Sequence, residues 1–128
     1  MAEIPPDLRY TNDHEWAKVT QGNTVRVGIT DFAQSSLGDI VFVSVHGMDS
    51  TVESGDTFGE VESTKSVSDL FSPVAGVVAA VNEQLASTPE TINADSYGDG
   101  WLFELDIDDE TELDDLLDAD TYADEVAS

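Results

Sequence analysis

One lysine stands where two β-prone runs of this chain meet at a short polar turn. Lys65 lies between Thr64 and Ser66, and small polar residues of this kind favour a tight turn between two strands. The chain of 128 residues contains four Lys and Arg residues against 28 Asp and Glu residues, so few amines are available to it. A primary amine held at the tip of a hairpin suits the covalent attachment of a carrier group.

A lysine in a polar loop is more commonly a solvated surface residue or, in enzymes, a nucleophile. A nucleophilic lysine needs burial or a neighbouring cation to release its proton. The nearest charges in the sequence are the carboxylates of Glu62 and Asp69, which favour the protonated amine. An external enzyme must therefore supply both the activated acyl group and the base. We expect Lys65 to be the substrate of a modifying enzyme and the chain to have no catalytic residue.

The residues around Lys65 form a longer pattern with defined spacing. Its members are Val61, Glu62, Ser63, Lys65, Ser68, Asp69, Ser72, Pro73 and Gly76. This pattern resembles the lipoyl-lysine hairpin of the glycine cleavage system H-protein family, in which Val-Glu-Ser-x-Lys precedes Ser-Asp, a Ser-Pro step and a Gly. The resemblance implies that lipoate is attached to Lys65 through an amide.

Other segments of the chain are similar to the same family and follow in the family's order. They are residues 10–16, similar to its opening strand, then residues 27–34, 37–43, Asn82, 92–93 and 97–102. We therefore expect a single lipoyl-carrier domain over residues 1–128. Its core should cover about residues 8–107, and an acidic helical segment should follow at about residues 108–128.

Two other carrier families share this hairpin architecture. The attachment lysine of biotin carriers is typically flanked by methionines, but the only methionines here are Met1 and Met48. Lipoyl domains of 2-oxo acid dehydrogenases usually have Asp-Lys-Ala, whereas Thr64 and Ser66 flank Lys65 in this chain. The sequence fits a lipoyl H protein better than either alternative.

The resemblance implies a shuttle that receives the aminomethyl group of glycine from a pyridoxal-phosphate-dependent glycine decarboxylase. A tetrahydrofolate-dependent aminomethyltransferase would remove that group, and dihydrolipoyl dehydrogenase would reoxidise the arm. A lipoate or octanoate ligase or transferase would load Lys65. A shuttle among large partners suggests a monomer. Two alternatives stay open here: an H-like protein that relays octanoyl or lipoyl groups to other lipoate-dependent enzymes, and an unmodified acidic interaction module.

The family resemblance also implies a cleft into which the loaded arm folds. Glu15 and Asp69 match the family's acidic positions, and a carboxylate there would hold the cationic amine through a charge-assisted hydrogen bond. Ser36 stands where family members often carry a histidine, and it is the third candidate for arm docking. His14 and His46 lack an organised set of carboxylates, so we expect no metal site.

Local signals predict the elements that must position these residues. Strands are expected at 16–20, 24–29, 39–45, 57–63, 66–71, 77–81 and 101–107, with a turn at 21–23 and a helix at 31–37. Thr30 is a suitable N-cap for that helix and Gly38 a suitable end. Strand 39–45 is apolar on both faces, which predicts burial between two layers. Spacings of three and four among the C-terminal apolar residues predict amphipathic helices broken near residues 118–120.

These elements together predict a mostly β protein with a barrel-sandwich hybrid fold of the biotinyl/lipoyl-carrier type, one short internal helix and C-terminal amphipathic helices. The formal charge is −24, which excludes nucleic acid as a natural partner because phosphate binding needs clustered cations. With 40% hydrophobic residues the chain can still form a core. Neither a signal peptide nor a long apolar run is evident, so we expect a cytoplasmic protein without a membrane span. Such acidity also suggests an extreme halophile, since molar salt screens carboxylate repulsion.

Overall fold

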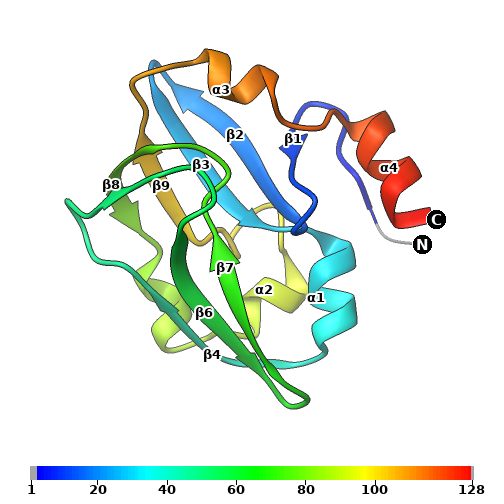
Figure 1. The fold of residues 1–128 in the computed structure, drawn as a ribbon. Coiled ribbons are helices and arrows are strands. Elements are labelled where there is room, and N and C mark those ends of the chain that lie inside the picture. The colour runs from blue at the N-terminus through cyan, green and yellow to red at the C-terminus, as the bar shows by residue number, and fades with distance from the viewer. Residues whose placement is uncertain (1–2, 128) are drawn as a thin grey trace.

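The computed structural model describes residues 3–127, whose strands form two sheets (Figure 1). The six-stranded sheet has the order β1-β2-β3-β9-β8-β5: β1 Arg9–Tyr10, β2 Glu15–Gln21, β3 Thr24–Ile29, β9 Phe103–Asp106, β8 Gly76–Val81 and β5 Thr51–Val52. The three-stranded sheet has the order β4-β6-β7: β4 Ile40–Val45, β6 Thr57–Ser63 and β7 Val67–Phe71. The helices are α1 Asp31–Leu37, α2 Thr91–Ala94, α3 Thr111–Asp114 and α4 Ala119–Ala127, with a 3₁₀ turn η1 at Glu83–Ala86. The expected mostly β, barrel-sandwich class is confirmed.

The internal helix α1 forms where the sequence predicts it. The Thr30 side chain accepts a hydrogen bond from the Ala33 amide at 3.2 Å, which caps the first turn. Gly38 ends the helix with φ 86°, a left-handed conformation that a residue with a Cβ adopts only at a cost. The Gly38 amide donates to the Gln34 carbonyl at 3.0 Å. Both ends of α1 are therefore determined by local chemistry.

The segment expected as one opening strand is divided in two. The His14 amide donates to the Thr11 carbonyl at 3.1 Å and closes a turn between β1 and β2. His14 has φ 69°, so the backbone reverses at a residue that is not glycine. Tyr10 then pairs with Trp16 across the antiparallel β1–β2 ladder. The turn places the next residue, Glu15, at the start of β2.

The prediction that strand 39–45 is buried on both faces is wrong. In β4, Val41 is 48% exposed and Phe42 is 56% exposed. The strand lies at the edge of the three-stranded sheet, and only one face packs on the core, through Ile40, Val43 and Val45. A register shift between Ile40 and Phe42 separates the buried first residue from the exposed ones. An apolar pattern on both faces therefore does not establish that both faces are covered.

The C-terminal region forms the expected amphipathic helices. Leu113 in α3 packs against the main core, whereas Leu117 and Tyr122 pack against a second cluster. That second cluster contains the buried residues Leu8, Tyr10, Trp16 and Tyr122. The expected break is confirmed because Asp118 precedes α4 and its carboxylate accepts from the Thr121 amide at 2.8 Å. Residue 128 of the expected segment lies outside the described residues. The short elements β5, η1 and α2 were not predicted.

Candidate functional site: a lysine hairpin beside an acidic cleft

Lys65 occupies the tip of the β6–β7 hairpin, which lies at the opposite end of the molecule from α3 (Figure 1). The Ser63 hydroxyl oxygen accepts hydrogen bonds from the Lys65 and Ser66 amides, each at 3.1 Å. The Thr64 amide donates to the Asp39 carbonyl at 3.0 Å, which fastens the tip to the start of β4. The Lys65 side chain is exposed. The turn thus holds the backbone in place while the amine stays accessible.

The Lys65 side chain passes over the end of α1. A Cβ added at Gly38 would lie 3.1 Å from Lys65 Cε, so the lysine stem uses the space that glycine leaves. The Gly38 carbonyl accepts from the Asn93 side chain at 2.8 Å, and the Ile40 amide donates to Asn93 Oδ1 at 2.9 Å. Asn93 therefore supports the connection between α1 and β4 on which the lysine rests.

A cleft of about 460 Å³ separates α1 from β7 and the start of β2. It is lined by Asn12, Asp13, His14, Glu15, Ile29, Phe32, Ala33, Ser36, Leu37, Val61, Ser68, Asp69, Leu70 and Phe71. All three residues expected to dock the arm, Glu15, Ser36 and Asp69, are among them. Leu37 in this lining precedes Gly38 in the chain, and Gly38 lies close to Lys65 Cε, so the cleft begins near the outer end of the Lys65 side chain. A group attached to Lys65 can fold into it.

Glu15 is the buried acid of the cleft, with 2% of its surface exposed. Its Oε2 accepts from the Phe71 amide at 3.1 Å, and its Oε1 accepts from the Thr11 hydroxyl at 2.9 Å. Burial raises the pKa of the Glu15 carboxyl to about 8, and these two hydrogen bonds oppose the rise only partly. The carboxyl is therefore largely neutral at pH 7. A cation arriving beside it would favour its ionised form.

The other two candidates lie at the solvent-exposed side of the same cleft. Asp69 is exposed on β7, in register with Glu60 of β6. Ser36 is exposed on the last turn of α1. The cleft thus combines one buried carboxyl at Glu15 with two exposed acids, Asp13 and Asp69.

The sequence did not reveal that Tyr122, which lies outside the lining, supports the cleft residue His14. Tyr122 of α4 places its hydroxyl 2.8 Å from His14 Nδ1 and 2.7 Å from the Thr30 hydroxyl. Burial lowers the pKa of the His14 imidazole, which favours the neutral ring. The neutral ring can accept a hydrogen bond from the Tyr122 hydroxyl, while the Thr30 hydroxyl donates to the Tyr122 oxygen. The His14 ring also lies 4.8 Å from the Phe32 ring, which lines the cleft. The C-terminal helix therefore connects the turn before β2 to the N-cap of α1.

Replacing Tyr122 with Phe should lower the free energy of unfolding by about 1–3 kcal/mol, since the buried Thr30 hydroxyl and the half-buried His14 ring lose their shared partner. Urea unfolding would measure this change. Tyr97→Phe is the matched control, because the Tyr97 hydroxyl also bonds two backbone groups but its side chain is partly exposed and water can replace it. Equal losses in the two variants would contradict the connecting role of Tyr122.

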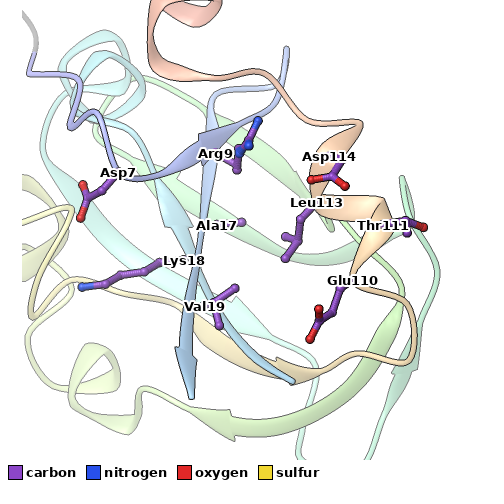
Figure 2. Close-up of a pocket in the computed structure, with 9 residues that line it drawn as sticks. All are labelled: Asp7, Arg9, Ala17, Lys18, Val19, Glu110, Thr111, Leu113 and Asp114. Atoms are coloured by element: carbon purple, nitrogen blue, oxygen red, sulfur yellow. The ribbon is translucent and has the colours of Figure 1, made fainter. Parts of the chain in front are cut away.

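A second cavity, of about 570 Å³, is larger than this cleft and lies elsewhere (Figure 2). It lies between β1, β2 and α3, and Figure 2 shows Leu113 directed toward Ala17 and Val19. Cations and carboxylates both line it, including Arg9 and Asp114. None of the residues that the sequence predicted for the site is in its lining, and the hairpin tip lies at the far end of the molecule (Figure 1).

Comparison with known proteins finds similar chains of nearly the same length. The family described as Glycine cleavage H-protein matches residues 8–128. The glycine cleavage system H protein of Mycobacterium avium (strain 104) is 52% identical over 126 residues, covering 95% of this chain and 96% of that protein. The one from Marinobacter nauticus is 51% identical over 128 residues, covering 100% of this chain and 98% of that protein. The crystal structure of a glycine cleavage system H protein from Mycobacterium marinum superposes with a TM-score of 0.86 at 41% identity, covering 98% of this chain and 100% of that one.

Proposed function

This chain belongs to the glycine cleavage H-protein family, and we propose that Lys65 carries the lipoyl group of a glycine cleavage shuttle. The observation that supports this assignment best is the exposed Lys65 side chain on a hairpin tip fixed to Asp39, beside a cleft that contains Glu15. The attachment residue needs an accessible amine, and the loaded arm needs a place to fold. The hairpin and the cleft supply these two features side by side.

The attachment reaction requires little from this chain beyond presentation of the amine. The free-base Nζ of Lys65 attacks the carbonyl carbon of an activated lipoyl or octanoyl group. The amide C–N bond forms, the bond to the leaving group breaks, and the amine proton passes to a base on the modifying enzyme. This chain contributes a fixed backbone around Ser63 and an unobstructed side chain. We propose that it is a non-catalytic carrier.

The partners follow from the shuttle function. A pyridoxal-phosphate-dependent glycine decarboxylase would load the aminomethyl group onto the arm and release CO2. A tetrahydrofolate-dependent aminomethyltransferase would then take the methylene group and release ammonia, and dihydrolipoyl dehydrogenase would reoxidise the dithiol. Covalent tethering raises the effective concentration of the carried group at each active site. We propose that the carrier works as a monomeric single domain, because each partner must reach the same arm.

Reconstitution with these enzymes tests the proposed function. Lipoylated protein should support CO2 release from glycine, whereas the protein with a free Lys65 should support none above background. The assay uses a purified glycine decarboxylase and follows labelled CO2. Equal rates with the loaded and the unloaded protein would refute the carrier function.

We propose that Glu15, Ser36 and Asp69 protect the aminomethylated arm inside the cleft. The arm then bears a cationic amine, for which Asp69 offers a carboxylate at the rim and Glu15 a buried carboxyl. Docking the cation beside Glu15 would favour release of its proton. Enclosure keeps water from hydrolysing the adduct to formaldehyde, ammonia and free thiol.

Replacing Asp69 with Asn should shorten the lifetime of the aminomethyl adduct about tenfold, which corresponds to one charge-assisted hydrogen bond of about 1.4 kcal/mol. Formaldehyde release from preloaded protein measures this lifetime. Glu60→Gln is the matched control, since Glu60 is an exposed acid in register with Asp69 but does not line the cleft. Unchanged formaldehyde release in the Asp69 variant would show that this carboxylate does not hold the arm.

No helix among residues 3–127 is long and apolar enough to cross a membrane. We propose that the protein acts in the cytoplasm and that its formal charge of −24 is an adaptation to high salt. One ion pair, Arg26 with Glu104 at 2.9 Å, is found among the described residues, so few acids have a cationic partner. The melting temperature should therefore rise steeply between dilute and molar KCl, which calorimetry measures. An unchanged melting temperature would exclude the salt adaptation without affecting the carrier function.

A further inference from the structure

The outer face of the three-stranded sheet has an exposed apolar pair next to the hairpin tip. Phe42 pairs with Glu62, and Glu62 pairs with Val67, so the three side chains form one row across β4, β6 and β7. Phe42 is 56% exposed and Val67 is 58% exposed. Two strand spacings place Phe42 and Val67 about 10 Å apart. We refer to Phe42, Glu62 and Val67 as the outer row.

This exposure is unusual in a chain of such high charge. Scattered exposed apolar residues are ordinary, but the outer row joins other apolar surface. Val41 is also 48% exposed beside Phe42. A groove of about 360 Å³ continues from Phe42 along β4 to Leu85 and Ala86 of η1. The structure therefore presents a mainly apolar strip, which Ser44, Asn82 and Glu83 interrupt in the groove and Glu62 interrupts in the outer row.

The position of the outer row indicates which partner would cover it. Val67 lies two residues from Lys65, and Glu62 three residues from it, on the two arms of the same hairpin. The enzyme that forms the amide must bring its active site to Lys65 Nζ itself. The enzymes of the cleavage cycle act on the far end of the arm and need no contact with the lysine. Continuity with the attachment point therefore favours the acylating enzyme.

We propose that the outer row is the docking surface for the enzyme that acylates Lys65. This inference rests on the proposed function of Lys65 as the attachment site. The next exposed row of the same face is Ser44, Glu60 and Asp69, so carboxylates at Glu60, Glu62 and Asp69 surround the apolar residues. The matching surface on the enzyme is an apolar depression with a basic rim. Phe42 is the expected anchor, because aromatic residues surrounded by polar contacts dominate such interfaces.

The test compares rates of acylation of the full-length protein. A purified bacterial lipoate ligase with ATP and lipoate would act on wild type, Phe42→Thr, Val67→Thr and the double variant. The matched controls are Val19→Thr and Val77→Thr, whose side chains are 50% and 40% exposed on the other sheet. The initial rate of mass gain at Lys65 gives kcat/KM. Thermal unfolding of each variant establishes that the fold is retained.

The outer-row variants should each lose about fivefold or more in kcat/KM, mainly through KM, and the double variant should lose more. The controls should stay within about twofold of wild type, since they lie outside the contact. The double variant, once lipoylated by prolonged incubation, should support glycine decarboxylation at the wild-type rate.

A double variant acylated at the wild-type rate would overturn the docking surface while leaving Lys65 as the attachment site. If the lipoylated double variant lost as much activity in glycine decarboxylation as the unmodified variant lost in acylation, the assignment would also be overturned, because the surface would then serve several partners. Failure of the wild type to be acylated at Lys65 would overturn the proposed function and this inference together.

Discussion

Replacing Lys65 with Arg abolishes lipoylation and glycine-dependent CO2 release while the protein stays folded. Arginine keeps the positive charge but its guanidinium stays protonated, so it cannot attack an activated acyl group. The Lys65 side chain is exposed at the hairpin tip, where its substitution removes no buried contact of the core. We expect activity at background level and an unchanged melting temperature. Intact mass and the reconstituted decarboxylation assay measure the two effects.

The matched control is Lys18→Arg, at the only other lysine of the chain. Lys18 is exposed on β2, opposite Arg26, and the label of β2 lies far from the β6–β7 hairpin tip (Figure 1). This variant should acquire the lipoyl mass and support CO2 release at the wild-type rate. Carrier activity retained by the Lys65 variant, or lost by the Lys18 variant, would contradict the assignment.

The second large effect concerns the buried acid of the cleft. The pKa of Glu15 is raised from an ordinary value of 4.5 to about 8, chiefly by burial. The folded state therefore binds a proton more tightly than the unfolded state does. The associated stability is fully present below pH 4.5 and is lost as the pH rises toward 8. Between these values the free energy of unfolding should fall by about 1.4 kcal/mol per pH unit from this group alone.

Glu15→Gln should remove that slope, because an amide does not ionise, and its single oxygen can still accept from the Phe71 amide. The variant should be more stable than wild type at pH 8–9, where wild type must bury a charge. Urea unfolding at fixed salt between pH 5.5 and 9 measures the difference. Glu60→Gln, at an exposed acid, is the control, and its free energy of unfolding should vary with pH as that of wild type does. If the free energy of unfolding of Glu15→Gln varied with pH as that of wild type does, burial would not have raised the pKa of Glu15.

The parts of the fold that local chemistry determines were predictable from the sequence. Gly22 adopts φ 54° in the predicted turn between β2 and β3, and Thr30 and Gly38 bound α1 as expected. The hairpin around Lys65 follows from two β-prone runs and a small polar turn. In each example the turn or cap residue lies within a few positions of the element that it ends or begins.

The burial of Glu15 and the contacts of His14 could not be predicted in this way. Glu15 bonds Phe71, which is 56 positions away, and His14 bonds Tyr122, which is 108 positions away. No local pattern distinguishes Glu15 from the many solvated acids of this chain. The spacing from Thr11 to Glu15 was the available signal, since the Thr11 hydroxyl bonds both the amide and the carboxyl of Glu15.

The exposure of β4 depends on neighbours that the chain does not provide. Val41 and Phe42 have the composition of a strand covered on both faces, yet the three-stranded sheet ends at β4. An apolar pattern shows that a strand can be buried, but it does not show whether another segment of this chain covers it. The outer row next to Lys65 is therefore visible only once the register of β4, β6 and β7 is known.

Peptide mass spectrometry of the protein purified from its native host tests the central claim most directly. The account predicts a lipoyl mass on the peptide that contains Lys65 and an unmodified Lys18. A biotin mass at Lys65 would contradict the identity of the carried group, and octanoate alone would favour a relay to other enzymes. An unmodified Lys65 in every molecule from cells actively degrading glycine would contradict the account itself.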